Sequence, residues 1–330
     1  MNAIGVAYQL PPDKQRALKR AKRVEWTFIG FLLSIIALMA LVMGSSQTMK
    51  AMWMEDTLSL VPSCSFLAGA YFRKKRPDEA FPYGYRRAVL VGFLCGAVVL
   101  FGFGVFIFVD SVIKLIAVEH PTIQTVEIFG KYIWLGWLMV AVLVYSVIPP
   151  ISFGRMKVPL ASELHDKALH VSAQINKGDC LSGIAGVAGI VGISYGFWWA
   201  DSIAAGFISI EIVRDGYINL RNSVAQLMNK RPSDIESQKE DPAIDTLQQA
   251  LERLDWIARA RVRLREDGDV LSGEVFIEPP DDRNLLDRMA EARNLAMSID
   301  WRLHDVSMVP VRSVDQARIC GHNDLSLSGQ

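Results

Sequence analysis

The stretch Val89–Val109, VLVGFLCGAVVLFGFGVFIFV, is an unbroken apolar run without a single charge. A helix needs about 20 apolar residues to cross the roughly 30 Å hydrocarbon core of a bilayer, so this stretch predicts a transmembrane helix. Apolar runs on either side of it predict a set of spans near residues 26–46, 52–72, 88–114, 131–153, 165–197 and 200–220. The sequence therefore predicts a multi-pass α-helical membrane protein with six transmembrane helices.

The composition changes along the chain. Hydrophobic residues make up 51% of the whole, but the sequence becomes polar and charged after Arg231. The change predicts a membrane domain followed by a smaller soluble domain. The predicted regions are a cytoplasmic N-terminal tail at 1–25, a transmembrane domain at 26–230, a cytoplasmic domain at 231–314 and a disordered tail at 315–330.

Basic residues indicate how the chain is oriented in the membrane. Lysine and arginine are frequent in the N-terminal tail, in the loop 73–87 and after the fourth span, whereas the opposite loops contain only Lys50 and Lys131. Loops rich in Lys and Arg stay in the cytoplasm. We therefore expect both termini to be cytoplasmic and the protein to lie in the plasma (inner) membrane. The basic loop 73–87 could also bind anionic lipid.

The polar C-terminal region has its own pattern. Helical periodicity at Pro242–Leu254 is followed by β-type stretches at Ile257–Leu264 and Leu271–Glu278. An amphipathic helix is expected at Asp281–Ile299 and a third strand at Leu303–Val311. The order αββαβ predicts a ferredoxin-like α+β domain with an antiparallel sheet.

Acidic residues occur inside segments that are long enough to span a membrane. Glu55 and Asp56 lie within Met52–Phe72, and Asp179 lies within the fifth apolar segment. A charge in hydrocarbon costs several kcal/mol, so an intramembrane acid indicates a functional site. Acids in two different segments suggest ligands that converge on a cation. A buried ion pair is the alternative reading.

Specific motifs resemble the cation diffusion facilitator family. The loop Arg76-Pro-Asp-Glu-Ala-Phe-Pro-Tyr-Gly-Tyr-Arg-Arg87 is similar to that family's Pro-Asp-Glu-x-x-Pro-Tyr-Gly loop. Tyr195-Gly-Phe-Trp-Trp-Ala-Asp201 looks like its junction between spans five and six, and Gly44-Ser-Ser-Gln47 fits the end of span one. The resemblance covers about residues 20–315. It implies proton-coupled export of divalent transition metals by homodimers, with the C-terminal domain as the dimerisation domain.

The chain departs from the family at the metal ligands. The family's two ligand pairs, each at i and i+4, would fall on Glu55 and Ser59 in span two and on Ile175 and Asp179 in span five. Asp56 and Asn176 lie close by as substitutes. A site of Glu55, Asp56, Ser59, Asn176 and Asp179 offers only oxygen, which suits Mn²⁺ or Fe²⁺ better than Zn²⁺. The metal is a substrate, and no permanently bound cofactor is expected.

Other polar residues allow alternative interpretations. Asp166 and His170 are spaced by four residues and could form a cytoplasmic entrance site for the cation. Lys177 could instead pair with Glu55 or Asp56 and occupy the place of the metal. Glu211 lies close to Arg214 and Asp215, and we interpret it as part of an inner ion pair rather than as a ligand.

Two functions follow from this reading. The first is a divalent-metal transporter, for export out of the cytoplasm in exchange for protons. The second is a non-transporting dimeric scaffold or regulatory relative that has lost the metal cage. No nucleophile–base pair, nucleotide-binding loop or HExxH motif occurs, so we expect neither an enzyme nor a nucleic-acid-binding protein.

Overall fold

The computed structural model describes residues 10–315 except 74, 76, 119–124, 129–130, 235–238, 269 and 282. Within helices and strands, the side chains of 126–128, 131, 133 and 175–180 lie outside the description. The chain divides into two compact units, Met1–Met228 and Asn229–Gln330.

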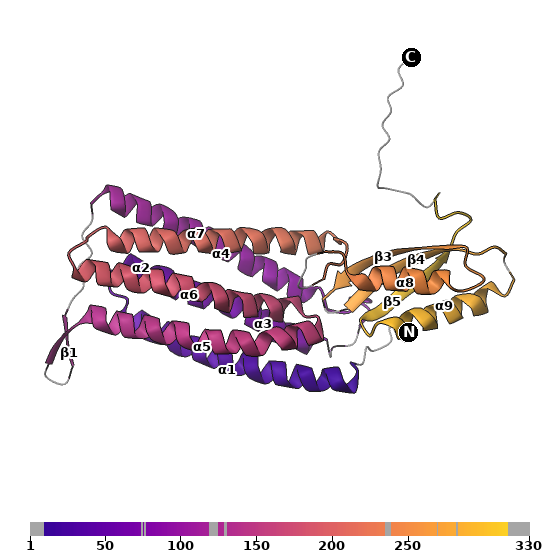
Figure 1. The fold of residues 1–330 in the computed structure, drawn as a ribbon, viewed down its shortest axis with the longest axis horizontal. Coiled ribbons are helices and arrows are strands. Elements are labelled where there is room, and N and C mark those ends of the chain that lie inside the picture. The colour runs from indigo at the N-terminus through magenta and orange to yellow at the C-terminus, as the bar shows by residue number, and fades with distance from the viewer. Residues whose placement is uncertain are drawn as a thin grey trace, which may run out of the picture. The chain divides into compact units, whose positions relative to one another are not determined.

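The first unit is a bundle of helices that run side by side (Figure 1). A short antiparallel hairpin of β1 (Thr125–Ile128) and β2 (Lys131–Trp134) precedes α5. The helices are α1 (Pro12–Val42), α2 (Gln47–Leu58), α3 (Leu60–Phe72), α4 (Ala88–Ile116), α5 (Leu135–Leu164), α6 (Lys167–Ser194) and α7 (Ala200–Leu227).

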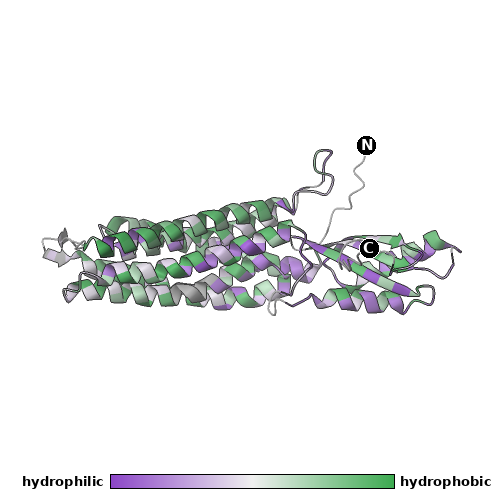
Figure 2. Cartoon of the chain, turned by 90° about the horizontal axis from the view of Figure 1, so that it is seen from above, coloured by the Kyte–Doolittle hydropathy of each residue, from purple (hydrophilic) through white to green (hydrophobic). Residues whose placement is uncertain are grey.

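Three of these helices are long and apolar enough to cross a membrane by length and composition among the described residues, namely α1, α4 and α5. Figure 2 shows hydrophobic residues along most of the first unit. Large apolar side chains are exposed on its surface, among them Phe106, Ile113, Trp137 and Ile210. Soluble proteins rarely expose so much apolar surface in one region, so a lipid environment explains these faces.

Several helices do not begin or end where the predicted spans do. The first span was expected to begin at residue 26, but α1 begins at Pro12 and takes in much of the predicted tail. The fourth was expected at 131–153, but 131–134 form β2 and α5 continues to Leu164. The helix α5 includes Pro149, Pro150 and Pro159, which sequence rules treat as helix breakers.

The predicted second span is divided in two. The helix α2 ends at Leu58, and α3 begins at Leu60. Pro62 has no N–H to donate to the carbonyl of Leu58, and its ring crowds that carbonyl, which accounts for the break. The Ser59 hydroxyl donates to the carbonyl of Glu55 at 3.0 Å. The break thus lies directly beside the acidic pair Glu55 and Asp56.

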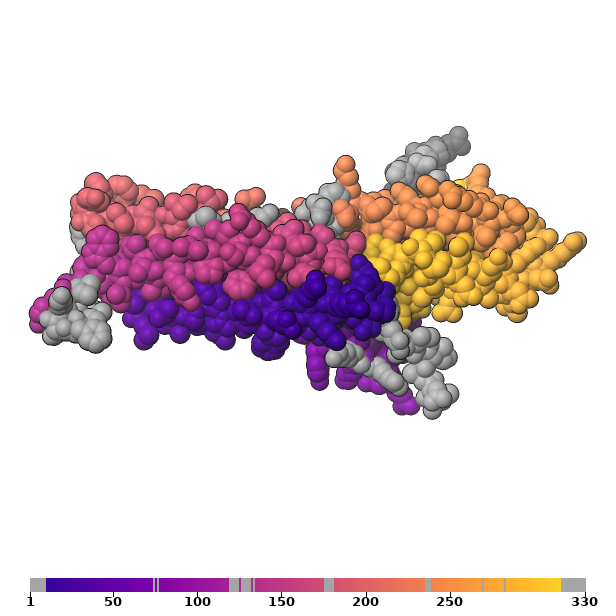
Figure 3. All heavy atoms as spheres, turned by 60° about the horizontal axis from the view of Figure 1, so that its bottom comes forward, coloured from indigo at the N-terminus to yellow at the C-terminus, as the bar shows by residue number. Residues whose placement is uncertain are grey.

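Glycines allow α4 and α7 to pack closely. A Cβ placed on Gly216 would lie 2.7 Å from the backbone nitrogen of Phe101, and one on Gly104 would lie 2.9 Å from a methyl of Ile212. Small residues are the usual means of close helix packing in membranes. On the face drawn in Figure 3, α1 (indigo) and α5 (magenta) likewise lie side by side.

The second unit is a three-stranded sheet with two helices. Its elements follow the predicted order, although α9 begins four residues later than expected. They are α8 (Pro242–Glu252), β3 (Arg259–Asp267), β4 (Val270–Glu278), α9 (Leu285–Ile299) and β5 (Leu303–Pro310). The strand order is β3-β4-β5.

The prediction of an antiparallel sheet was wrong for one pair of strands. β3 and β4 are antiparallel, joined by a tight turn at Gly268, whereas β4 and β5 are parallel. The helix α9 carries the chain back to the starting end of β4, and such a crossover produces a parallel neighbour. The ferredoxin-like topology itself stays a prediction.

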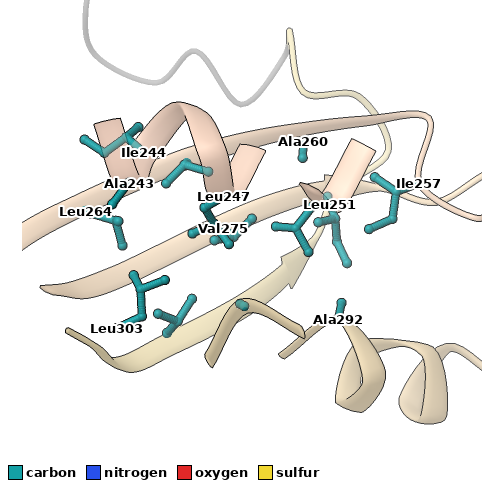
Figure 4. Close-up of a cluster of buried hydrophobic side chains, with 14 of the residues drawn as sticks. Ala243, Ile244, Leu247, Leu251, Ile257, Ala260, Leu264, Val275, Ala292 and Leu303 are labelled. Atoms are coloured by element: carbon teal, nitrogen blue, oxygen red, sulfur yellow. The ribbon is translucent and has the colours of Figure 1, made fainter. Parts of the chain in front are cut away.

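The core of the second unit lies between the helices and the sheet (Figure 4). Ile244, Leu247 and Leu251 repeat at helical spacing along α8 and are fully buried. They pack in one cluster with Val275 of β4 and Leu303 of β5. The alternation of buried and exposed residues along β3 places its apolar side chains in the same core.

Arg302 should be important for the stability of this unit. Its guanidinium donates to both oxygens of Asp241 at 2.6 and 3.0 Å and also to Asp300, and Asp241 caps α8 at the amide of Ala243. Arg302→Met should therefore destabilise the unit by about 2–3 kcal/mol, because hydrogen bonds to buried charged groups are lost.

Arg259→Met is the control for this prediction. It lies in the exposed pair with Asp315 and should change stability by less than about 1 kcal/mol. Hydrogen exchange of the α8 amides in the full-length protein measures both effects, and equal effects would contradict the role of Arg302.

Candidate functional site

Two carboxylates from different helices meet at one hydroxyl inside the helical unit. The Ser182 hydroxyl of α6 lies 2.8 Å from Oε1 of Glu55 on α2 and 3.2 Å from Oε2 of Glu211 on α7. A hydroxyl has one hydrogen and can donate it to only one acceptor at a time. Glu55 and Glu211 are therefore like charges held close together, an arrangement that favours a bound proton or cation.

A cavity lies beside these carboxylates. Its volume is about 40 Å³, and its polar lining comes from Glu55, Ser59, Glu211, Asp215 and Asn219. Apolar residues of α2, α3, α4 and α7 form the remaining walls. A cavity of this size with several polar partners can hold a water-sized guest.

Asp56, which follows the half-buried Glu55 on α2, is a fully buried acid. Its side chain is only 4% exposed, and Oδ2 has no hydrogen-bond partner among the described residues. Burial of a carboxylate oxygen without a hydrogen-bond partner costs free energy, because the oxygen loses its hydrogen bonds to water. Glu55 and Asp56 thus place two acidic side chains next to the break between α2 and α3.

Some of the predicted site residues lie at the cavity, and the side chains of the others are not described. Glu55 and Ser59 line the cavity, with Asp56 next to them. The side chains of Asn176, Asp179 and Lys177 lie outside the described residues. Within the described part of the chain, no three His, Cys, Asp or Glu side chains converge as metal ligands.

Contacts on either side fix how α6 runs past α2 and α3. Gly189 and Gly186 lie against Thr48, a Cβ on Gly189 being 3.0 Å from the Thr48 hydroxyl oxygen. Ser182 meets Glu55, and further along α6 the Ser172 hydroxyl is 3.2 Å from that of Ser63 on α3. The helices are therefore antiparallel, and helix positions 176 and 179 fall between the contacts made at Ser182 and Ser172.

The predicted entrance residues have structural roles. Asp166 caps α6 by accepting from the amide of Leu169 at 3.1 Å, and it lies 3.8 Å from a guanidinium nitrogen of Arg73. His170 lies within hydrogen-bond distance of Gln174, four residues further along the same helix. An entrance site at Asp166 and His170 stays a prediction.

Asp78 in the loop after α3 has a structural role. The Tyr85 hydroxyl and the Phe81 amide both donate to its carboxylate, and these hydrogen bonds lower the pKa of Asp78 below its ordinary value. Lys75 lies 3.5 Å from the centroid of the Tyr85 ring. The interactions fold this loop around the Tyr85 side chain.

Three polar contacts in the structure were not predicted from the sequence. Glu211 was interpreted as part of an inner ion pair, whereas the structure brings it to Ser182 and the cavity. Glu25 and Lys157 form a fully buried pair, with 3.1 Å between Oε1 and Nζ. Asp201, used only as a motif landmark, accepts hydrogen bonds from the start of α2. A charge next to or inside an apolar run was the available signal for all three.

Long apolar helices that enclose acidic side chains beside a cavity are typical of integral membrane proteins that transport cations. A family model for the cation efflux transmembrane domain matches residues 26–228, and the chain belongs to this cation efflux family of transporters.

The chain is similar to two manganese efflux system proteins of Bacillus subtilis. MneS is 22% identical over 275 residues, covering 83% of this chain and 87% of that protein. MneP is 24% identical over 275 residues, covering 81% and 86%. The metal cation efflux system protein CzcD of Cupriavidus metallidurans is 26% identical over 237 residues, 70% of this chain and 67% of CzcD.

Proposed function

We propose that this protein exports a divalent transition-metal cation from the cytoplasm in exchange for protons. The observation that carries the proposal is the meeting of Glu55 and Glu211 at Ser182, beside a cavity inside an apolar helical unit. Like charges so placed attract a cation and release it when they are protonated. Family membership supports the direction of transport.

The proposed cation site comprises the predicted ligands Glu55, Asp56, Ser59, Asn176 and Asp179, together with Glu211. The antiparallel packing of α6 against α2 and α3 supports it, because positions 176 and 179 fall on the stretch of α6 opposite the helix break. Ser172, 176 and 179 lie within about 60° of one another around the helix at 3.6 residues per turn. Lys177 as a counter-ion in the absence of metal is part of the same proposal.

The chemistry of the donors favours manganese or iron over zinc. All the proposed ligands offer oxygen, and oxygen ligands suit the harder divalent ions. The similar proteins MneS and MneP are named as manganese efflux system proteins, which agrees with this preference.

The proposal includes an arrangement in the membrane. The α2–α3 pair and the helices α1, α4, α5, α6 and α7 supply six spans, with both termini in the cytoplasm and the protein in the plasma membrane. The region 231–314 joins two copies into a homodimer, and the basic loop 73–87 contacts anionic lipid. Two-fold dimers are the commonest symmetric oligomers, which supports this part of the proposal.

Uptake into proteoliposomes tests the proposal. Full-length protein in vesicles with an imposed pH gradient should accumulate Mn²⁺ or Fe²⁺ faster than Zn²⁺, and collapse of the gradient with an ionophore should stop net uptake. Vesicles without protein are the control. If no divalent ion in the panel moves faster than in the control vesicles, the transport proposal is wrong and the scaffold alternative takes its place.

The scaffold alternative has one observation in its favour. The family's ligand pattern is altered at Ser59 and Ile175. A scaffold should dimerise normally and leave metal sensitivity unchanged when its gene is deleted. Metal tolerance of a deletion strain therefore separates the two functions.

A further inference from the structure

The start of α2 is held by a carboxylate from α7. Asp201 lies in the first turn of α7 and is 1% exposed. Its Oδ1 accepts from the Ser46 hydroxyl at 2.7 Å and from the Thr48 amide at 3.1 Å, and its Oδ2 accepts from the Gln47 amide at 2.6 Å. We call this set of contacts the Asp201 cap.

The Asp201 cap replaces a local helix cap with a tertiary one. The first amides of a helix lack partners within the helix and carry the positive end of its dipole, so a carboxylate is well placed there. Such caps usually come from the residue preceding the helix. Here the Ser46 hydroxyl accepts from the Met49 amide. The two preceding amides, those of Gln47 and Thr48, donate to Asp201 on another helix. The cap therefore fixes α2 relative to α7.

Thr48 joins the Asp201 cap to α6, and we call the place where these three helices meet the corner. Its hydroxyl donates to the backbone carbonyl of Asp201 at 2.9 Å. A Cβ on Gly189 of α6 would lie 3.0 Å from that hydroxyl oxygen and only 2.6 Å from the Cβ of Ala204 on α7. With so little space, α6 can neither rotate nor slide here without a clash. The helices α2, α6 and α7 are thus fixed to one another at this corner.

The contacts around Thr48 and the contact between Glu55 and Ser182 are related by helix geometry. Glu55 follows Thr48 by seven residues on α2, and Ser182 precedes Gly189 by seven residues on α6. At 1.5 Å per residue, both steps are roughly 10 Å in these antiparallel helices, so the two contacts lie at matching levels. A shift of α2 along its axis at the Asp201 cap would move Glu55 away from Ser182 and from Glu211 by the same amount.

From these contacts we infer that Asp201 is a positioning residue for the cation site. It sets the axial position of α2 against α6 and α7, and thereby holds Glu55 opposite Glu211. Asp201 itself is about two turns or more from the acids and does not bind the cation. The functional part of the inference rests on the proposed function, whereas the structural part stands on the contacts alone.

Asp201→Asn is the variant that tests the inference, because it keeps the size of the side chain but replaces one acceptor oxygen by an NH₂ group. Hydrogen exchange of the full-length protein in micelles should show at least about tenfold faster exchange in the first turn of α2. Titration with Mn²⁺ should show about 10- to 100-fold weaker binding, the range typical of residues that orient metal ligands. Transport should show a raised KM for Mn²⁺.

Matched variants separate positioning from general loss of packing. Thr48→Val removes the hydroxyl bond to Asp201 at constant shape, whereas Thr48→Ser keeps it and should behave like the parent protein. Ser209→Ala removes a buried hydroxyl on α7 that donates only to its own helix, at Gly206, and should leave Mn²⁺ binding unchanged.

The outcomes distinguish the two proposals. Unchanged exchange in α2 of the Asp201→Asn protein would overturn the inference. Faster exchange with unchanged Mn²⁺ affinity would show that the cap stabilises α2 without positioning the site, and would equally overturn it. If the parent protein binds no divalent cation from the panel, the proposed function fails, and the exchange data alone decide whether Asp201 fixes α2.

Discussion

Glu55→Gln should reduce metal transport by more than about 100-fold. Glutamine keeps the length of the side chain and an oxygen that can accept from Ser182, but it removes the charge that faces Glu211. Loss of one partner of a charge in a low-dielectric site costs about 3–5 kcal/mol, which corresponds to roughly 10²- to 4 × 10³-fold in affinity. Asp179→Ala should have an effect in the same direction, because it removes the acid at a family ligand position.

Proteoliposome uptake of Mn²⁺, at matched protein content, is the measurement for both variants. Glu163→Gln makes the same chemical change on the exposed face of α5 and should leave transport unaltered. A well-folded Glu55→Gln protein that transports at the parent rate would remove Glu55 from the site. If Glu211→Gln alone abolished transport, the cation would be bound mainly by α7.

The helical architecture could be predicted largely from the sequence. The uncharged run at Val89–Val109 falls within α4, because a continuous apolar segment has few alternatives to a buried or lipid-facing helix. The break between α2 and α3 was missed although Pro62 signalled it. The prolines of α5 show the opposite case, in which the helix continues through residues that should end it, and single-residue rules cannot separate the two.

The candidate site could be predicted only in part. Glu55, Asp56 and Ser59 are close in sequence, so helical spacing brought them together. Glu211 meets Ser182 across 29 residues and Asp201 meets Ser46 across 155, and such pairs follow from how helices pack. The parallel pairing of β4 and β5 depends in the same way on where α9 crosses, which strand patterns do not specify.

The buried pair Glu25–Lys157 joins four helices. Lys157 on α5 lies 3.1 Å from Oε1 of Glu25 on α1 and donates to the Ser172 hydroxyl of α6 at 2.7 Å. Ser172 in turn lies 3.2 Å from Oε1 of Glu25 and 3.2 Å from the hydroxyl of Ser63 on α3. Both charged side chains are fully buried, and Lys157 also lies 3.4 Å from the ring centroid of Phe28. Each charge is therefore tolerated because of the other.

Lys157→Met should destabilise the helical unit by about 3–5 kcal/mol, because it leaves the charge of Glu25 buried and uncompensated. The double variant Glu25→Gln with Lys157→Met removes both charges and should be less destabilised than the sum of the two single variants, by about 0.5–3 kcal/mol.

Unfolding in mixed micelles, followed by circular dichroism, measures these free energies. Lys114→Met in the partly exposed pair with Asp110 is the control and should change stability by less than about 1 kcal/mol. A Lys157→Met protein as stable as this control, or strictly additive single variants, would contradict the view that the pair holds α1 and α5 to α6.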